Sequence, residues 1–546
     1  MADTVREIER KYEADDSTEL PDLTGVAGVA AIADQGTVVL SATYYDTPDQ
    51  RLAADGITLR RRTGGGDAGW HLKLPVAPGV RDEVRMPLGD RLPHKLAALV
   101  RSRVRGACLA PVAHLRTRRA LWVLEDARGE PLAEVAVDDV VAHRVGDGAV
   151  PHAAEATCAA DVAHEVAYGT AYEADGEGRP GTRPDRVAAG VRWREIEVEL
   201  VGDGVPGLLD AVERVLAAAG VRPAGAASKL ARALAGTAGG ETARAGTARP
   251  APRTAGDAVL AYVREQVRTL VELDPAVRRD LPDSVHRMRV ATRRLRSVFR
   301  SYGTVLDRSV TDPMLGELTW LAEQLGVDRD REVLAERLRA GLAGLPRDLR
   351  LGPVAARLRL WSQRRRLGSR QALLAVLDGS RHLALLESLH ALLADPPLCP
   401  AAARPPARPM AKAVLKDYRR LAGRVAAALA TPPGPERDEA LHSARKAAKR
   451  ARYAAEAAGP ALGRPAERFA GRMKRVQQLL GDHQDSVLAR GALRELAVQA
   501  HGAGEGGFTF GLLYGREEAA AAARERELPE VWRKAAKPGL RRKLGG

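Results

Sequence analysis

Two patterns of hydrophobic and polar positions divide the chain. Over residues 1–235, short runs alternate between apolar and charged side chains, and turns rich in Gly and Pro separate them. Such alternation predicts half-buried β-strands. Beyond residue 256, apolar residues recur at helical spacing in long segments rich in Ala, Leu and Arg. The pattern therefore predicts an α+β multidomain protein, with a β-rich N-terminal domain followed by an all-helical region.

Two segments without an apolar period mark the expected boundaries. Residues 236–256 are rich in Gly, Ala and Thr, which is the composition of a flexible linker. Residues 396–409 are rich in Pro and predict a second linker. The predicted domains are therefore 1–235, 257–395 and 410–546, the last two being the halves of the helical region.

One face of the predicted strands carries charged side chains almost exclusively. Glu7, Glu9 and Lys11 are spaced by two residues, so they share one face of a strand. The same spacing recurs in Arg60/Arg62, His71/Lys73, Arg81/Glu83/Arg85, Arg116/Arg118, Glu134/Asp138 and Glu195/Glu197/Glu199. A single strand of this kind is usually the solvated face of a half-buried sheet. Seven of them favour a closed barrel with a charged interior.

The chemistry of this face suits a phosphate ligand. Arginines bind phosphate oxygens through paired hydrogen bonds, and lysines add positive charge. The carboxylates would repel a polyanion unless they held a divalent cation, for which Mg²⁺ and Mn²⁺ are the suited metals. Such an ion polarises a terminal phosphoryl group and positions water for attack. The pattern thus indicates a metal-dependent phosphate site.

Composition narrows the possible partners. The net charge of +15 at pH 7 favours a polyanion. Aromatic residues are only 4% of the chain, and no helix-turn-helix or zinc spacing is present, which disfavours nucleic acid. The three cysteines are too far apart to predict a disulfide framework. Without a signal peptide or an apolar run of about 20 residues, we expect a cytoplasmic protein that does not enter membranes.

The helical region contains an internal duplication. His286 and His442 lie 156 positions apart, and basic residues follow each at +3, +7, +8 and +10. These residues are Arg289, Arg293, Arg294 and Arg296 in the first copy, and Arg445, Lys449, Arg450 and Arg452 in the second. A Leu-Gly-x-x-x-Asp segment also occurs twice, at Leu325 and at Leu480. Two signals at nearly one offset indicate a repeated unit.

Each copy predicts a basic stripe along a helix. Positions +3, +7 and +10 lie within about 80° of the histidine around a helix axis. A charged run is most often a solvated face, but such faces normally include Glu for pairing at i+4. Neither segment has an acidic residue from the histidine to +10, which favours a binding surface. Metal binding by these histidines is less favoured, because no second His or Cys lies at i+4.

The N-terminal motifs resemble those of the CYTH superfamily, the triphosphate tunnel metalloenzymes. Glu7-Ile-Glu9-Arg-Lys11 matches the family's ExExK signature. The supporting segments are Tyr45-Asp46-Thr47, Leu59-Arg60-Arg61-Arg62, Leu72-Lys73-Leu74-Pro75, Arg81-Asp82-Glu83, Arg194-Glu195-Ile196-Glu197-Val198-Glu199-Leu200 and Ser228-Lys229. The resemblance spans residues 4–234. It implies an eight-stranded antiparallel β tunnel with flanking helices, bound Mg²⁺ or Mn²⁺, and hydrolysis of inorganic triphosphate.

The resemblance also implies roles for individual residues. Carboxylates would hold the metal, namely Glu7, Glu9, Asp138, Glu195, Glu197 and Glu199. Cations would hold the triphosphate, namely Lys11, Arg60, Arg62, Lys73, Arg81, Arg116, Arg118 and Lys229. Of these, the expected catalytic residues are Lys11, Arg60, Arg62 and Lys73. Within the same family, hydrolysis of thiamine triphosphate and cyclisation of ATP by an adenylate cyclase are alternatives.

The helical motifs resemble the CHAD domain, the conserved histidine α-helical domain, over residues 255–533. The resemblance implies two four-helix bundles related by pseudo-twofold symmetry, with a basic groove that binds inorganic polyphosphate. The expected polyphosphate-binding residues are His286, Arg289, Arg293, Arg294, Arg296, His442, Arg445, Lys446, Lys449, Arg450 and Arg452. The favoured interpretation is a cytoplasmic inorganic triphosphatase joined to a polyphosphate-binding domain, with possible residence at polyphosphate granules. A non-catalytic protein that only targets such granules is the alternative.

Overall fold

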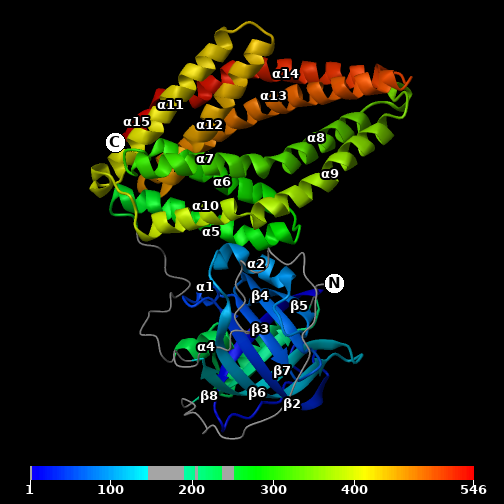
Figure 1. Cartoon of the computed structure of the whole chain (residues 1–546), viewed down its shortest axis with the longest axis vertical. Coiled ribbons are helices and arrows are strands. Elements are labelled where there is room, and N and C mark those ends of the chain that lie inside the picture. Colours follow the sequence, from blue (N-terminus) through cyan, green and yellow to red (C-terminus); the bar gives the residue numbers. More distant parts are fainter. Residues whose placement is uncertain (1–2, 146–189, 203, 205–206, 236–250, 546) are drawn as a thin grey trace, which may run out of the picture. The chain divides into compact units, whose positions relative to one another are not determined.

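A computed structural model gives the architecture of the chain (Figure 1). It describes all residues except 1–2, 146–189, 203, 205–206, 236–250 and 546, and only the backbone of 3, 327–332, 363–369 and 545. The chain divides into two compact units, Met1–Ala245 and Gly246–Gly546, called here the barrel unit and the helical unit. Among the described helices, none combines the length and apolarity needed to span a bilayer.

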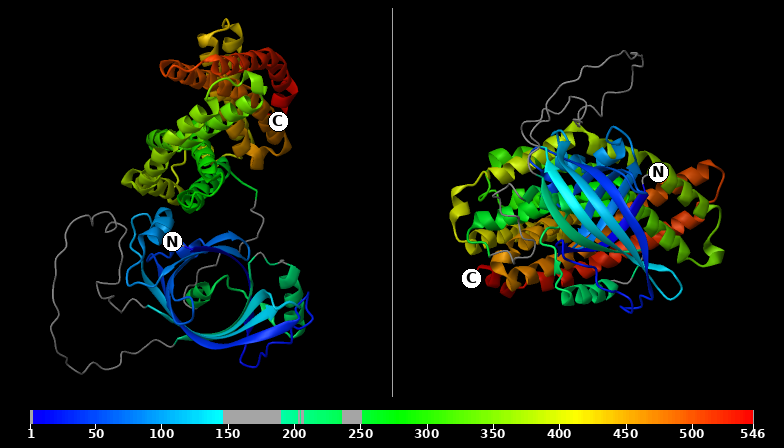
Figure 2. Two further views of the ribbon diagram at one scale, coloured as in Figure 1. Left: turned by 90° about the vertical axis from the view of Figure 1, so that its right-hand side faces the viewer. Right: turned by 90° about the horizontal axis from the view of Figure 1, so that it is seen from below.

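The barrel unit is a ring of eight antiparallel strands (Figure 2). The strands are β1 (Asp3–Ala14), β2 (Ala31–Asp46), β3 (Thr58–Thr63), β4 (Gly69–Ala77), β5 (Val80–Pro87), β6 (Ala110–Glu125), β7 (Pro131–Arg144) and β8 (Val191–Leu200). Their order is β5-β4-β3-β2-β6-β7-β8-β1, and pairing of β5 with β1 closes the ring. The two-residue strand β9 (Arg222–Pro223) pairs beside β1. The predicted closed barrel of eight antiparallel strands is confirmed.

Apolar side chains of these strands point out of the ring and lie beneath helices. On one side, Leu72 and Trp70 of β4 share a buried cluster with Leu96 and Val100 of α2 (His94–Val104). On another side, Val198 of β8 belongs to a cluster with residues of α3 (Gly207–Ala218). A short helix α1 (Arg51–Ala54) follows β2. Because the apolar face is turned outward, the alternating charged face is turned into the ring.

The helix α4 (Lys229–Ala235) lies within one end of the ring (Figure 2). Its residues Leu230 and Leu234 form a buried cluster with Tyr44, Leu115 and other interior residues of β2, β6, β7 and β8. At this end the interior of the ring is therefore apolar. Lys229, at the first turn of α4, lies where this apolar end meets the charged part of the interior.

The helical unit consists of two consecutive sets of antiparallel helices. The first set comprises α5 (Ala255–Arg278), α6 (Ser284–Ser301), α7 (Arg308–Gln324), α8 (Gly326–Ala343), α9 (Val354–Asp378) and α10 (Ser380–Ala394). The second set comprises α11 (Ala407–Ala430), α12 (Pro435–Leu462), α13 (Arg464–Gly502), α14 (Phe508–Ala535) and α15 (Pro538–Gly545). Helix α7 begins at Arg308 and α13 at Arg464, 156 positions later, which repeats the offset of the two basic segments. The duplicated all-helical architecture is thus confirmed.

The two sets share one core rather than standing apart. Buried residues of α5, α6, α11, α12 and α13 belong to the same hydrophobic cluster. Across it, the hydroxyl of Tyr302 donates a hydrogen bond to the carbonyl oxygen of Ala454 at 2.6 Å. Between the sets, the Pro-rich segment includes the short 3₁₀ helix η3 (Pro400–Ala403), and Ala402 is buried against the shared core.

Among the cysteines, Cys399 is free and half-buried. Cys158 lies outside the described residues, so the expectation that the cysteines form no disulfide framework stays a prediction.

Candidate functional site

Charged side chains of the barrel unit meet across the interior of the ring. Arg60 on β3 lies 3.7 Å from the carboxylate of Glu83 on β5, with β4 between the two strands. Arg119 on β6 lies 2.6 Å from Glu197 on β8, with β7 between them. Side chains on strands that are not neighbours can pair in this way only by pointing into the ring. The interior is therefore a charged site built from several strands.

A first cluster of interior charges is centred on Glu83. Its carboxylate lies 2.9 Å from Nδ1 of His71 and 3.9 Å from Nζ of Lys73. Burial by itself would raise the pKa of Glu83, but His71, Lys73 and Arg60 together hold it well below its usual range. Burial lowers the pKa of His71 to about 4, so its imidazole is neutral at pH 7. Lys73 Nζ also lies 2.6 Å from the carboxylate of Glu7.

A second cluster surrounds Lys229 of α4. Its ammonium lies 2.9 Å from Asp138 and 2.7 Å from Glu195, and it also pairs with Glu197. Arg119 pairs with Asp138 at 2.7 Å from the other side. Burial opposes the charge of Lys229, yet the three carboxylates raise its pKa. The oxygens of Asp138, Glu195 and Glu197 lie close enough together to hold a metal ion. Lys11 also pairs with Glu197, so three cations surround this group.

A third group of carboxylates consists of Glu7, Glu9 and Glu199. Lys73 and Arg85 pair with Glu7, and Lys11 and Arg81 pair with Glu9. Glu9 of β1 lies directly opposite Glu199 of β8 in the antiparallel register. Burial opposes the charge of Glu9, but Lys11 at 3.0 Å and Lys73 lower its pKa to about 2. Glu199 makes no hydrogen bond or ion pair within the described part of the chain. Burial and the neighbouring Glu7 raise its pKa to about 7.

These oxygen donors fit a hard divalent cation. Glu7 and Glu9 repel the carboxylate of Glu199 in a largely buried space, and Lys73 only partly offsets that repulsion. A divalent cation relieves that repulsion and prefers carboxylate oxygens as ligands. Two sets of interior carboxylates therefore offer such ligands, namely Glu7, Glu9 and Glu199, and Asp138, Glu195 and Glu197. Of these two sets, the second brings its three ligand oxygens within 4.8 Å of one another.

Most residues that the sequence predicted for this site face the interior. These are Glu7, Glu9, Lys11, Arg60, Arg62, Lys73, Arg81, Asp138, Glu195, Glu197, Glu199 and Lys229. The prediction that Arg116 and Arg118 also face it is wrong. Both are exposed on the outer face of β6, where Arg118 pairs with Asp139 at 2.7 Å. On this strand the interior residues are Leu115, Thr117 and Arg119, of which only the last is charged.

Arg119 is the interior cation that the sequence analysis missed. The segment Arg116-Thr-Arg118-Arg119 has arginine at both even and odd positions, so the alternation along a strand does not show which arginine points inward. The neighbouring interior positions are apolar because they lie under α4. The expectation that the more highly charged face of a strand is always the inner face was therefore wrong at this end of the barrel. The register of Arg119 opposite Asp138 is the signal that identifies it.

The helical unit contains a groove of about 820 Å³ between its two basic stripes. Helix α6 supplies one wall and α12 the other, while α8 and α13 contribute further residues. The predicted residues that line it are His286, Arg289, Arg293, Arg294, His442, Arg445, Lys449 and Arg452. The two copies of the sequence motif thus face one another across a single groove. Among the described side chains that line it, Asp485 is the one acidic residue.

Two arginines that line the groove share the same protein partners. Arg294 of the first copy and Arg452 of the second bind the same carboxylate, that of Glu456, at 3.0 and 2.6 Å. Both guanidinium groups also lie over the ring of Tyr453, at 5.7 and 5.4 Å from its centre. These arginines are therefore held in place by protein contacts, in addition to lining the groove.

Three predicted residues do not line the groove, and the expectation for them is wrong. Lys446 is exposed outside it. Arg450 turns toward the core, where it pairs with Asp417 at 2.9 Å and donates to the carbonyl oxygen of Arg300. Arg296 is half-buried, and burial lowers its pKa. Groove residues that the sequence analysis missed include Arg337, Gln477 and Gln484, which come from helices that carry no basic stripe.

The charge of the groove is predominantly positive. Burial and the neighbouring Lys446 lower the pKa of His442, so this imidazole is neutral at pH 7. Burial raises the pKa of Asp485, although Arg445 lies 3.8 Å from its carboxylate. The cations therefore dominate the potential of the groove.

Comparison with known proteins agrees with both units. A family model of the CYTH domain matches residues 5–151, and one of the CHAD domain matches residues 261–494. The chain therefore belongs to the family of proteins in which a CYTH domain precedes a CHAD domain. The CYTH match ends after β7, and the structure adds β8 with Glu195, Glu197 and Glu199 as the strand that completes the ring.

Relatives and solved structures cover both the whole chain and its parts. The chain is 39% identical over 537 residues to the uncharacterized protein Rv2226 of Mycobacterium tuberculosis, covering 96% of this chain and 95% of that protein. PptA from Streptomyces chartreusis is similar to 51% of this chain over 99% of its own, at 23% identity and a TM-score of 0.44. The CHAD domain from the plant Ricinus communis is similar to 53% of this chain over 94% of its own, at 24% identity and a TM-score of 0.42.

Proposed function

We propose that the barrel unit hydrolyses inorganic triphosphate to pyrophosphate and phosphate, with Mg²⁺ or Mn²⁺ as cofactor. The observation that carries this proposal is the arrangement of Glu7, Glu9 and Glu199 beside a set of interior cations. The carboxylates provide oxygen ligands, and the cations provide partners for a linear polyanion. A small, highly charged substrate suits an interior in which most of the described polar groups are ionised.

Two groups of interior cations would bind different phosphate groups of the substrate. Arg60 and Lys73 lie together near Glu83, whereas Lys11, Arg119 and Lys229 lie around Glu197. A linear triphosphate has oxygens along its whole length, so it can replace carboxylates as partner of both groups. When bound, the metal would polarise the terminal phosphoryl group and supply a positioned water. The residues of the chain would hold the phosphates in line for attack.

A phosphate-release assay tests this function. The full chain is tested with Mg²⁺ or Mn²⁺ on triphosphate, nucleoside triphosphates, thiamine triphosphate and long-chain polyphosphate. The double variant Glu7→Gln/Glu9→Gln removes two anionic ligands at nearly constant volume and is expected to abolish hydrolysis. The matched control Glu19→Gln/Glu130→Gln makes the same charge change at two exposed sites and should be fully active. Near wild-type turnover of the first variant at saturating metal would contradict the proposal.

For the helical unit, we infer binding of inorganic polyphosphate in the groove between α6 and α12. The supporting observation is that cations from both copies of the motif line one groove. A flexible chain of evenly spaced charges can contact both walls, whereas a single small anion cannot span them. Binding of this kind would bring the barrel unit to polyphosphate granules in the cytoplasm. A protein that only binds polyphosphate is the competing function, and the phosphate-release assay separates the two.

A further inference from the structure

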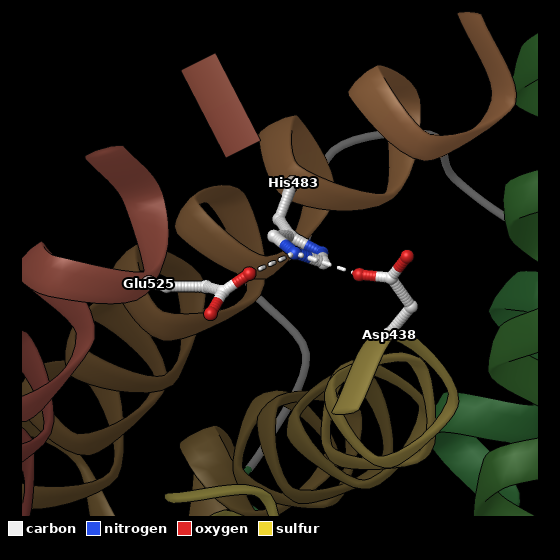
Figure 3. A group of neighbouring side chains, drawn as sticks. All are labelled: Asp438, His483 and Glu525. Atoms are coloured by element: carbon white, nitrogen blue, oxygen red, sulfur yellow. Dashed lines mark hydrogen bonds and ion pairs between the residues drawn. The ribbon is translucent and has the colours of Figure 1, made fainter. Parts of the chain in front are cut away.

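His483 lies at the centre of a buried polar cluster that the groove does not use. It belongs to α13 and is 1% exposed. Its Nε2 lies 3.3 Å from Oδ1 of Asp438 on α12 and 3.2 Å from Oε1 of Glu525 on α14 (Figure 3). Three consecutive helices thus direct one nitrogen and two carboxylate oxygens toward one another.

Hydrogen bonding alone does not account for this arrangement. A ring nitrogen of histidine carries at most one hydrogen, whether the imidazole is neutral or protonated. Two carboxylate oxygens face the same Nε2 at nearly equal distances, so one hydrogen cannot serve both well. Both distances also exceed the 2.7–2.9 Å that is usual for a charge-assisted hydrogen bond between N and O, by about 0.3 Å or more.

The two distances from Nε2 instead match the separation of ligand atoms bound to one metal ion. Zinc binds histidine nitrogen and carboxylate oxygen at about 2.0–2.1 Å, usually with tetrahedral geometry. Two ligand atoms in such a site lie about 3.3 Å apart, which follows from these bond lengths and the tetrahedral angle. Nε2 of His483 lies 3.2 and 3.3 Å from the two oxygens, and all three atoms lie within 4.8 Å of one another.

The surroundings orient the carboxylates by their outer oxygens. Arg490 Nη2 donates to Oδ2 of Asp438 at 2.8 Å, and Arg437 Nη1 donates to Oε2 of Glu525 at 3.1 Å. Each carboxylate is thereby fixed with its second oxygen toward His483. Metal-binding carboxylates are commonly held by such outer hydrogen bonds. The two guanidinium charges also oppose a cation, so the site should bind metal reversibly and not as a permanent structural ion.

We propose that Asp438, His483 and Glu525 form a binding site for a divalent transition metal of the zinc class, with the fourth position open to water. The site is separate from the barrel and from the duplicated groove. At the position of His483, the first copy of the Leu-Gly segment has Asp328. A metal there would tie together α12, α13 and α14. In the same turn of α13, Gln484 and Asp485 line the groove, so the metal would fix the position of that wall.

Titration of the full, metal-stripped chain with Co²⁺ or Zn²⁺ in excess Mg²⁺ tests the proposal. The Mg²⁺ occupies carboxylate-only sites, while the transition metal is selected by imidazole. We expect one Zn²⁺ or Co²⁺ per chain, with the intense visible absorption of tetrahedral Co²⁺. His483→Gln and Glu525→Gln should each weaken binding at least tenfold and remove that absorption. The matched control His501→Gln, an exposed histidine on the same helix, should bind like the wild type.

Two results would overturn the proposal. One is a wild-type chain that takes up no transition metal in excess Mg²⁺. The other is a tetrahedral Co²⁺ signal that survives both substitutions, because the metal would then lie elsewhere, for example at His286 and His442. Glu525→Gln keeps an acceptor oxygen for Arg437, so it leaves a folded protein to measure even if His483→Gln destabilises α13. Circular dichroism of each variant shows whether it is folded.

Discussion

Gly326 lies against the guanidinium group of Arg289, and a Cβ atom on Gly326 would lie 2.8 Å from Nη2 of that arginine. In the second copy of the motif, Gly481 lies against Arg445, where the corresponding distance is 3.5 Å. Gly326 therefore makes room for Arg289, whereas a Cβ at Gly481 would make only ordinary contact with Arg445. In both copies the glycine of the Leu-Gly segment lies against the first arginine of a basic stripe.

We expect Gly326→Ala to weaken polyphosphate binding without loss of stability. The new methyl group would displace Arg289 from the groove at a cost of about 1 kcal/mol, roughly fivefold in Kd. Alanine also favours the helix by up to about 1 kcal/mol relative to glycine, so the melting temperature should not fall. Gly481→Ala is the matched control, because its Cβ would make only ordinary contact. Equal affinity of the two variants would contradict a positioning role for Gly326.

Removing the groove cations should abolish tight polyphosphate binding. The quadruple variant Arg289→Ala, Arg293→Ala, Arg445→Ala, Lys449→Ala removes four cations that line the groove. By the counterion rule for nucleic acids, the slope of log Kd against log salt should fall by about three. The control variant removes four exposed cations elsewhere, Arg300, Lys412, Arg424 and Lys446, with the same change in net charge. If both variants lose affinity equally, total charge and not the groove determines binding.

Duplex DNA that is bound to the chain should be displaced by polyphosphate at a comparable concentration of charge.

Metal binding in the barrel should strengthen as the pH rises through 7. Burial and the neighbouring Glu7 raise the pKa of Glu199 from 4.5 to about 7. Without metal, stability should therefore fall as the pH rises from about 4.5 to about 7, because the folded state holds a proton that the unfolded state has lost. Above pH 7 the ionised carboxylate becomes a metal ligand. The increase in melting temperature caused by Mg²⁺ should thus be larger at about pH 8 than at about pH 6. Glu199→Gln should remove this difference, and an unchanged pH dependence would exclude Glu199 as its source.

The barrel unit should act without the helical unit. Every interior charge described for the barrel lies within Met1–Ala245. A chain ending at Ala245 is therefore expected to hydrolyse triphosphate within about twofold of the full chain at saturating substrate and metal. Phosphate release by the two chains gives the comparison, and circular dichroism shows whether the shorter chain is folded. A folded but inactive shorter chain would show that the helical unit contributes to hydrolysis.

Much of the barrel could be predicted from the sequence because a β-strand has a period of two. Alternation placed Glu7, Glu9 and Lys11 on one face, and that face is the inner one. The same rule gave the wrong face for Arg116 and Arg118. At this end α4 makes the interior apolar, so the charged face of the strand points outward. The choice between inner and outer face depends on what covers the strand. That information lies in a helix more than 100 residues away.

In the helical unit, the sequence by itself determined the two basic stripes and their duplication, since both follow from helical spacing and a repeated motif. Only the tertiary structure decided that the stripes face one another, and that Arg450 turns away to pair with Asp417. The cluster of Asp438, His483 and Glu525 is likewise invisible in the sequence. Local periodicity fixes which side chains share a helix face, whereas contacts between helices depend on packing of the whole core.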